Sequence, residues 1–191
     1  MDGKNILILG GTGDAISIAE KLSLIKNYKI ITSLAGVTQK PRLPIGKTHI
    51  GGFGGREGLI NFLEANQINL IVDATHPFST QIKENAIFAS NELFVPIIHF
   101  VRDQWKMEIG DKWHMVDNLP EASNKLRELS STRKLKVFLT VGRKGLADFA
   151  DILNSKFVIR SIEKPLALGG FSRAEWIEGR GPFSFDNELK L

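Results

Sequence analysis

The sequence predicts an α/β fold built from two doubly wound lobes with mainly parallel sheets. Three observations carry this prediction. Short apolar runs alternate with apolar residues at helical spacing along the chain, which is typical of strands joined by crossover helices. The first run, Ile6–Leu9, is uninterrupted and ends in glycines, as expected for a strand buried on both faces. A polar stretch at 102–112 separates two such sets of elements.

Each expected element rests on its own pattern of apolar residues. In the first lobe, 1–103, strands are expected at 6–9, 29–34, 49–50, 70–72 and 96–100, with helices at 15–25, 59–63 and 82–93. In the second lobe, 104–191, strands are expected at 113–116, 136–141, 157–161 and 175–178, with helices at 119–129 and 146–152. The run 183–191 resembles the start of a further helix. Because strands and helices alternate, the strands are expected to pair in parallel through right-handed crossovers.

Composition narrows the class of protein. With 42% hydrophobic and 24% charged residues in 191, the chain has ordinary globular composition. It contains no cysteine, which excludes disulfides, zinc thiolates and a cysteine nucleophile. No apolar run approaches the ~18 residues of a membrane helix, so we expect a cytoplasmic protein with no membrane partner. The net charge of +4 is spread thinly over the chain, which argues against nucleic acid and favours an anionic metabolite.

The strongest local signal is a glycine-rich turn between the first strand and the first helix. Glycines allow a tight turn and the close approach of a phosphate, and the helix start offers free N–H groups and a positive dipole end to a pyrophosphate. The candidate cofactor-binding residues are Gly10, Gly11, Thr12, Gly13, Asp14 and Ala15. The spacing departs from a strict G-x-G-x-x-G because Ile16 occupies the last position, and a simple turn is the alternative.

Two further turns follow strands of the first lobe. The second strand ends Thr32–Gly36 without the Asp or Glu that NAD-preferring sites place there, and Lys40 and Arg42 follow. This combination would accept a 2′-phosphate, so it predicts NADPH; an ordinary solvated loop is the alternative. After the third strand, the four glycines of Gly51–Gly55 indicate a backbone close to a ligand. Phe53 would then lie against a flat ring or, alternatively, pack into the core.

The fourth strand ends in Asp73–Phe78, and open α/β sheets bind their ligands at such strand ends. Of the four histidines, His76 is the best candidate to face a ligand, in a proton-donating or hydrogen-bonding role; a histidine that only fixes the turn is the alternative. The histidines at 49, 99 and 114 lie in expected strands and are expected to be packed or solvent-facing. No pair of histidines or carboxylates has metal-ligand spacing, so no metal is expected.

The succession GGTGDA, TSLAG, GGFGG and DATHPF resembles the precorrin-6A reductase family, including its cobalt-precorrin form. Later segments strengthen the resemblance: VPI at 95–97, Arg102 with Trp105, TVGRKGL at 140–146 and RGPF at 180–183. The resemblance implies a two-lobed Rossmann-like fold and an NADPH-dependent oxidoreductase of cobalamin biosynthesis. Members of the family reduce one double bond of precorrin-6A, or of its cobalt form, by hydride transfer, which yields precorrin-6B.

The resemblance also implies roles for individual residues. Carried over motif by motif, the cofactor-binding residues are Gly10 to Ala15 for the pyrophosphate; Ser33, Leu34, Ala35 and Gly36 for the ribose phosphate; and Gly52, Phe53, Gly54, Thr75 and His76 for the cofactor's flank and nicotinamide. The residues that would face the carboxylates of the tetrapyrrole substrate are Arg143, Lys144 and Arg180. His76 is the one candidate for a catalytic role.

The end of the sequence departs from the family pattern. Family members continue past the RGPF segment with further elements, whereas this sequence ends at Leu191. The second lobe is therefore expected to be incomplete at its C-terminus and either less stable, from about Asp103 on, or rescued by self-association. A truncated, non-catalytic dinucleotide-binding remnant of the family is the alternative function. Sugar epimerases and short-chain reductases are disfavoured, because they need a Tyr-x-x-x-Lys pair and Tyr28 is the only tyrosine.

Overall fold

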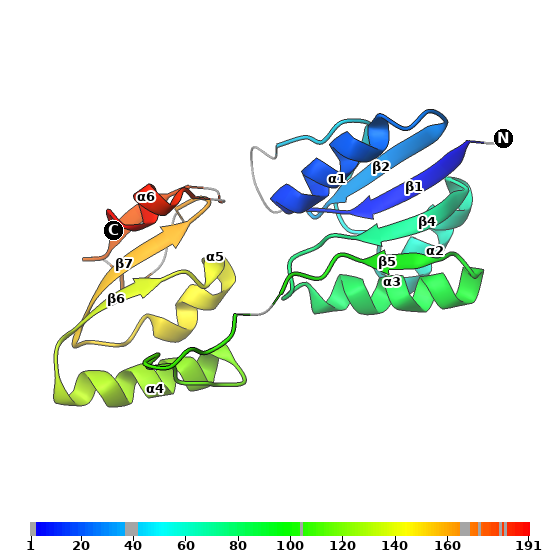
Figure 1. The fold of residues 1–191 in the computed structure, drawn as a ribbon. Coiled ribbons are helices and arrows are strands. Elements are labelled where there is room, and N and C mark those ends of the chain that lie inside the picture. Colours follow the sequence, from blue (N-terminus) through cyan, green and yellow to red (C-terminus); the bar gives the residue numbers. More distant parts are fainter. Residues whose placement is uncertain are drawn as a thin grey trace. The chain divides into compact units, whose positions relative to one another are not determined.

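Two compact units, Met1–Gln104 and Trp105–Leu191, make up the protein in a computed structural model, and each has its own sheet (Figure 1). The glycine-rich turns predicted to bind a cofactor all lie in the N-terminal unit. The structure describes residues 3–36, 42–103, 105–164, 169–171, 173–179, 181 and 183–191, without the side chains at 143 and 144.

The N-terminal unit alternates strands and helices. In chain order its elements are β1 (Lys4–Leu9), α1 (Gly13–Ser23), β2 (Tyr28–Leu34), β3 (Lys47–Ile50), α2 (Gly55–Ala65), β4 (Ile68–Asp73), α3 (Thr80–Leu93) and β5 (Ile97–His99). The sheet, called sheet A below, has the order β3-β2-β1-β4-β5, and every neighbouring pair is parallel. Because the strand order reverses between β1 and β4, helices cover both faces and a topological switch point lies between these two strands. The predicted doubly wound α/β fold is confirmed.

Alternation along β1 explains why both faces of sheet A are covered. Successive side chains of a strand point to opposite faces. Ile6 and Ile8 pack in the core beneath α1, whereas Leu7 and Leu9 pack in the core beneath α2 and α3. None of these four side chains is more than 1% exposed. Figure 1 shows α1 on one side of the sheet and α2 and α3 on the other.

The C-terminal unit repeats the α/β rhythm on a smaller scale. Its elements are α4 (Leu119–Thr132), β6 (Leu135–Leu139), α5 (Gly142–Gly145), the 3-10 helix η1 (Leu146–Phe149), β7 (Ser155–Ser161), β8 (Glu175–Glu178) and α6 (Phe185–Glu188). Sheet B has the order β6-β7-β8 and is also parallel. Leu139 and Ile159 on one face of this sheet form a core with Leu146 and Phe149 of η1, against which Leu126 of α4 packs.

The segment expected as a helix at 146–152 is helical only in part, because the 3-10 helix η1 covers Leu146–Phe149 and Ile152 lies outside it. Leu146, Phe149 and Ile152 recur at a spacing of three, and all three are buried. Within η1, three residues per turn set Leu146 and Phe149 on the same side, toward the core. The short α5 therefore passes into η1 rather than continuing as an α-helix.

The strand expected at 113–116 is wrong, because these residues have no regular secondary structure. Met115 is 77% exposed, and Trp113 and Val116 are also exposed. The apolar residues of the segment suit a strand but do not supply the neighbouring strand whose N–H and C=O groups it must pair with. The strand expected at 96–100 is shorter than predicted, since β5 spans Ile97–His99.

Candidate functional site

The predicted cofactor motifs of the N-terminal unit meet at one edge of sheet A. Because β3, β2, β1 and β4 are adjacent and parallel, their carboxyl ends lie side by side. Main-chain hydrogen bonds join each end to the next: Gly51 N to Leu34 O at 2.9 Å, Gly10 N to Ser33 O at 3.0 Å and Ala74 N to Leu9 O at 3.0 Å. The turns that follow these four strands are therefore held in one continuous row.

The glycines of the β1–α1 turn are required for different reasons. A Cβ on Gly10 would lie 2.8 Å from the carbonyl oxygen of Ser33, so β2 leaves no room for a side chain there. Gly11 has a φ of +104°, a conformation that residues with a side chain rarely adopt. Gly13 begins α1, and a Cβ there would have no atom within 4 Å apart from its chain neighbours and the backbone of its own helix. The turn is thus closely packed on the sheet side and open at the helix start.

Thr12 is the N-cap of α1 and fixes the direction of the helix start. Its Oγ1 accepts a hydrogen bond from the Ala15 amide at 3.2 Å and donates one to the Ala74 carbonyl at 2.7 Å. The amides of Gly13 and Asp14 precede Ala15 in the first turn, where a helix has no carbonyl to offer them. Together with the positive end of the helix dipole, this geometry suits an anion.

A carboxylate at the same helix start is paired with an arginine. Arg102, which follows β5, donates from Nε to Asp14 Oδ2 at 2.7 Å, and its Nη2 contacts the same oxygen. The two side chains are partly exposed. The guanidinium therefore offsets the negative charge that would otherwise oppose a phosphate beside Gly13. Arg102 belongs to a segment that supports the family resemblance, and although the sequence does not mark it as a site residue, it lies at this edge.

The end of β2 carries no acidic side chain. Ser33 and Leu34 are buried at the strand end, and Ala35 and Gly36 follow them as exposed residues. Gly36 lies against β3, because a Cβ on it would be 3.5 Å from a side-chain carbon of Ile50. The exposed part of this turn is therefore small and uncharged.

Of the two basic residues expected near the end of β2, Arg42 lies within the described residues and Lys40 does not. Arg42 is exposed, and its Nη2 lies 3.9 Å from Glu20 Oε1, which is a loose surface pair. Lys40 lies outside the described residues.

The glycine-rich loop after β3 presents backbone rather than an aromatic ring. The ring of Phe53 stacks on His49 with centroids 4.7 Å apart and an interplanar angle of 10°, and it meets the edge of Phe62 at 5.0 Å. Gly52 and Gly54 on either side are exposed, and Gly54, with φ +85°, occupies the N-cap position of α2. The Phe53 ring thus engages the protein's own side chains, and His49 is packed as expected.

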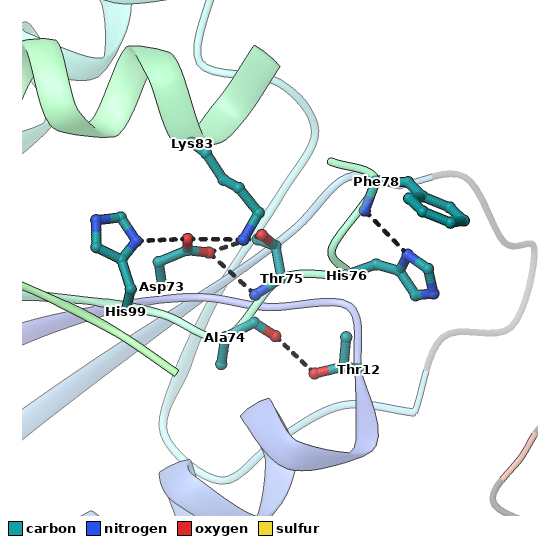
Figure 2. Close-up of polar contacts among 8 residues, drawn as sticks. All are labelled: Thr12, Asp73, Ala74, Thr75, His76, Phe78, Lys83 and His99. Carbon is teal, nitrogen blue, oxygen red and sulfur yellow. Dashed lines mark hydrogen bonds and ion pairs between the residues drawn. The ribbon is translucent and has the colours of Figure 1, made fainter. Parts of the chain in front are cut away.

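A buried carboxylate lies at the end of β4 and was not predicted as part of the site (Figure 2). Asp73 is 0% exposed. Its Oδ1 accepts from the Thr75 hydroxyl at 2.6 Å and from the Thr75 amide at 3.1 Å, and its Oδ2 lies 3.0 Å from Lys83 Nζ and 2.9 Å from His99 Nδ1. His99 was expected to be packed or solvent-facing in its strand. Its contact could have been inferred only by pairing β4 with β5, whose register sets Asp73 opposite His99.

The charge of Asp73 is maintained by its partners. Burial raises the pKa of a carboxyl group, but the hydrogen bonds from Thr75, His99 and Lys83 outweigh burial, and the pKa of Asp73 lies below its ordinary value. The group is therefore an anion at neutral pH. With an anionic acceptor beside it, Nδ1 of His99 carries the hydrogen of this contact.

His76 projects from the β4–α3 turn on the side away from Asp73 (Figure 2). Its Nδ1 accepts a hydrogen bond from the Phe78 amide at 3.3 Å, which leaves the proton of the neutral ring on Nε2. Partial desolvation lowers the pKa of His76, and the positive charges of Arg102 and Lys83 lower it further. At neutral pH the exposed ring is thus an uncharged hydrogen-bond donor through Nε2.

Comparison with known proteins assigns the chain to a family. Residues 5–191 match the family model described as "Precorrin-6x reductase CbiJ/CobK". The chain belongs to this family. It is 40% identical over 187 residues to the precorrin-6A reductase of Rhodococcus erythropolis, which covers 97% of this chain and 73% of that protein. It is 38% identical to the precorrin-6A reductase of Sinorhizobium sp, over 100% of this chain and 72% of that protein.

A solved structure agrees with the family and the fold. The structure of a protein named "CobK precorrin-6A reductase" is 30% identical and superposes with a TM-score of 0.88 over 98% of this chain and 72% of that chain. The predicted membership of the precorrin-6A reductase family and the predicted oxidoreductase class are therefore confirmed. The relatives are named as reductases, which is consistent with a nicotinamide cofactor.

The basic residues predicted to face the substrate belong to the C-terminal unit. Arg143 and Lys144 lie in α5, and their side chains are outside the described part of the structure. Arg180 is also outside the described residues. The cofactor motifs of the N-terminal unit are brought together, whereas these three residues stay predictions.

The described residues form neither an evident metal site nor a membrane span. In this part of the chain, no three or more His, Cys, Asp or Glu side chains are grouped so that they could hold a metal ion. No helix within the same described residues has the length and apolar character needed to span a membrane.

Proposed function

We propose that the chain reduces precorrin-6A to precorrin-6B by hydride transfer from NADPH, as a step of cobalamin biosynthesis. The observation that carries the proposal is the open start of α1 at Gly13, which lies at the switch point of a reductase-family sheet. The metal-free substrate is favoured because relatives named precorrin-6A reductase are 40% and 38% identical, whereas the cobalt-precorrin-6A reductase of Priestia megaterium is 28% identical. The cobalt form is the second candidate.

The β1–α1 turn fits the pyrophosphate of a dinucleotide. Gly10 allows the turn to pass close to β2. A Cβ placed on Gly13 would meet no atom within 4 Å outside its chain neighbours and its own helix backbone, so the space beside Gly13 is open. The amides of Gly13 and Asp14 would bind the phosphate oxygens. Arg102 would neutralise the Asp14 carboxylate, or would itself donate to a phosphate oxygen. These groups orient the cofactor along the edge of the sheet.

The preference for NADPH is supported by the neutral turn after β2. A carboxylate at this position would bind the 2′-hydroxyl of NADH and repel a 2′-phosphate. The segment Ser33–Gly36 has no charged side chain, and Arg42 further along is exposed with only a loose partner. We propose that Ser33, Leu34, Ala35 and Gly36 line the adenosine ribose phosphate.

The nicotinamide is proposed to lie against the β4–α3 turn, with the backbone of Gly52 and Gly54 along the cofactor's flank. When bound, the cofactor supplies the hydride for one carbon of the macrocycle's double bond, and the other carbon takes a proton. Thr75 and His76 would orient the ring, and Nε2–H of His76 offers a hydrogen bond to a carbonyl oxygen. Such positioning is the main contribution that a protein makes to hydride transfer.

The substrate side is proposed to be cationic. A tetrapyrrole with several carboxylates needs positive side chains, and Arg143, Lys144 and Arg180 in the C-terminal unit are the candidates. The net charge of +4 is in keeping with an anionic ligand.

Two measurements test the proposal. The dissociation constants of NADPH and NADH, compared at one salt concentration, are expected to favour NADPH. Turnover is then followed with metal-free and cobalt-bound precorrin-6A, and reduction of the metal-free form is expected to be faster. Equal affinity for the two cofactors would remove the assignment of the β2 turn. Tight NADPH binding with no turnover of either tetrapyrrole would instead support a non-catalytic dinucleotide-binding protein.

A further inference from the structure

Asp73 is an unusual residue to find buried at the end of a strand in a largely apolar sheet. It ends β4 between β1 and β5, and its side chain is 0% exposed. A buried carboxylate is costly unless hydrogen bonds replace the lost water. Four donors do so here: the amide and hydroxyl of Thr75, the Lys83 ammonium of α3 and the His99 imidazole of β5.

The division of these four bonds between the two oxygens indicates a role beyond packing. Oδ2 is held by Lys83 at 3.0 Å and His99 at 2.9 Å, which fixes the orientation of the carboxylate relative to α3 and β5. Oδ1 is then free to bind only Thr75, which lies two residues further along, in the turn. The Asp73 carboxylate therefore links β4, α3 and β5 to Thr75 and restricts the position of the first residues of the β4–α3 turn.

The same turn is fixed from a second side. Thr12, the N-cap of α1, donates to the Ala74 carbonyl at 2.7 Å, and the Phe78 amide closes the turn on His76 at 3.3 Å. Figure 2 shows Ala74 between these anchors, with Thr12 on one side and Asp73 on the other. The turn that carries Thr75 and His76 is thus tied both to the anion-binding start of α1 and to the buried carboxylate.

We propose that Asp73 is a positioning residue for the reduction, which acts through Thr75 to hold the β4–α3 turn in the geometry that hydride transfer requires. Lys83 and His99 serve this role by fixing the carboxylate. The inference rests on the proposed function, because it assumes that the nicotinamide lies against this turn. Asp73 does not touch the reactants, so its loss should lower the rate of the chemical step more than it weakens binding.

Asp73→Asn is the primary test. The amide keeps the shape and one acceptor oxygen, but its NH2 group cannot accept a hydrogen bond, so either Thr75 or the pair Lys83 and His99 loses its acceptor. We expect kcat to fall roughly 10- to 100-fold, with a much smaller change in the KM of precorrin-6A and in the NADPH dissociation constant. Ser90→Ala is the matched control, because the Ser90 hydroxyl donates a 2.6 Å bond to the Val95 carbonyl at the other end of α3. It should lower stability and leave kcat unchanged.

A second pair keeps the proposal testable if Asp73→Asn does not fold. Thr75→Val removes the hydroxyl bonded to Asp73 with little change of shape, whereas Thr75→Ser retains it. We expect Thr75→Ser to be at least about ten-fold faster in kcat than Thr75→Val, with both melting at similar temperatures. Equal rates in these two variants, or an unchanged kcat in folded Asp73→Asn, would overturn the role of Asp73.

The outcome also separates this inference from the proposed function. If the wild-type chain binds no NADPH or reduces no tetrapyrrole, the proposed function fails. If the wild-type chain is active and Ser90→Ala loses as much kcat as Asp73→Asn, only the positioning role fails, because general destabilisation then explains the loss.

Discussion

The two units are built from the same kind of sheet but cover it differently. In the N-terminal unit, helices cover both faces of sheet A, and β1 contributes two core residues to each side. In the C-terminal unit, sheet B has an apolar core on one face. On its other face, Arg160 of β7 lies between the rings of Phe138 and Phe183, 4.9 and 4.1 Å from their centroids, and pairs with Glu188 at 2.7 Å.

This difference has consequences for stability and for the site. A cation–aromatic contact contributes about 0.5–2 kcal/mol, whereas each fully buried aliphatic side chain contributes about 1.5–3 kcal/mol. Sheet A, with apolar packing on both faces, is therefore the firmer support for strand ends that must hold ligand-binding turns in place. Sheet B depends more on partly exposed contacts, and Phe138 is 44% exposed even beneath the guanidinium.

Matched truncations in the two cores should give the largest effects. Leu7→Ala empties a site in β1 that is 0% exposed, and we expect a loss of about 3–5 kcal/mol in the N-terminal unit. Leu139→Ala in β6, which is 5% exposed, should cost the C-terminal unit about 2–3 kcal/mol. Urea unfolding resolves the units, because all three tryptophans lie in the C-terminal unit, at 105, 113 and 176, and far-UV circular dichroism follows both. A larger loss for Leu139→Ala would reverse the comparison.

Hydrogen exchange compares the units without mutation. We expect amides of β6 and β7 to open at a free energy on the order of 2–3 kcal/mol lower than amides of β1 and β4, the contribution of one or two buried apolar side chains. Self-association through the C-terminal unit would raise its protection, so the mass in solution is measured in parallel. Uniform protection in a strict monomer would contradict the prediction.

Gly13→Val separates ligand binding from folding. Apart from its chain neighbours and the backbone of its own helix, no atom lies within 4 Å of the new Cβ position, so the N-terminal unit should fold normally. The side chain would occupy the space proposed for the pyrophosphate and should weaken NADPH roughly 10- to 100-fold, about 1.4–2.7 kcal/mol. Gly169→Val is the control, since Gly169 in the C-terminal unit is also open and has no left-handed φ. Unchanged NADPH affinity in folded Gly13→Val would remove this turn from the site.

Acid should lower the stability of the two units through different carboxylates, and we expect this effect to be smaller than those of the three preceding experiments. The pKa of Asp73 is lower in the folded chain, so its contribution to stability is present above the ordinary carboxyl pKa of about 3.9 and is lost as pH falls through the lower folded value. The pKa of Glu128 is also lowered, mainly by its hydrogen bond with Lys125, but that pair is on the surface and should matter little. Melting temperatures from pH 7 to pH 3 should therefore fall less steeply in Asp73→Asn than in the wild type. Parallel curves would show that Asp73 contributes no acid dependence.

Local sequence patterns predicted the elements of both units well where the pattern is compatible with only one kind of secondary structure. The uninterrupted run in β1, the glycines after it and the strand at Glu175–Glu178 are found where they were expected. The pattern failed where the outcome depends on a neighbour. The segment 113–116 is apolar enough for a strand but has no regular structure. The helix expected at 146–152 is a 3-10 helix that ends at Phe149.

The site divides in the same way between sequence and tertiary structure. The sequence by itself determined the glycine turn, the neutral end of β2 and the family, because these depend on residue types at short, fixed spacings. Only the tertiary structure decided that Asp73 is bound by Lys83 and His99, 10 and 26 residues further along the chain. A carboxylate alone does not reveal its donors, because they come from a helix and a strand whose positions are set by packing of the whole sheet. The burial that makes these bonds necessary also exists only once β1 and β5 flank β4.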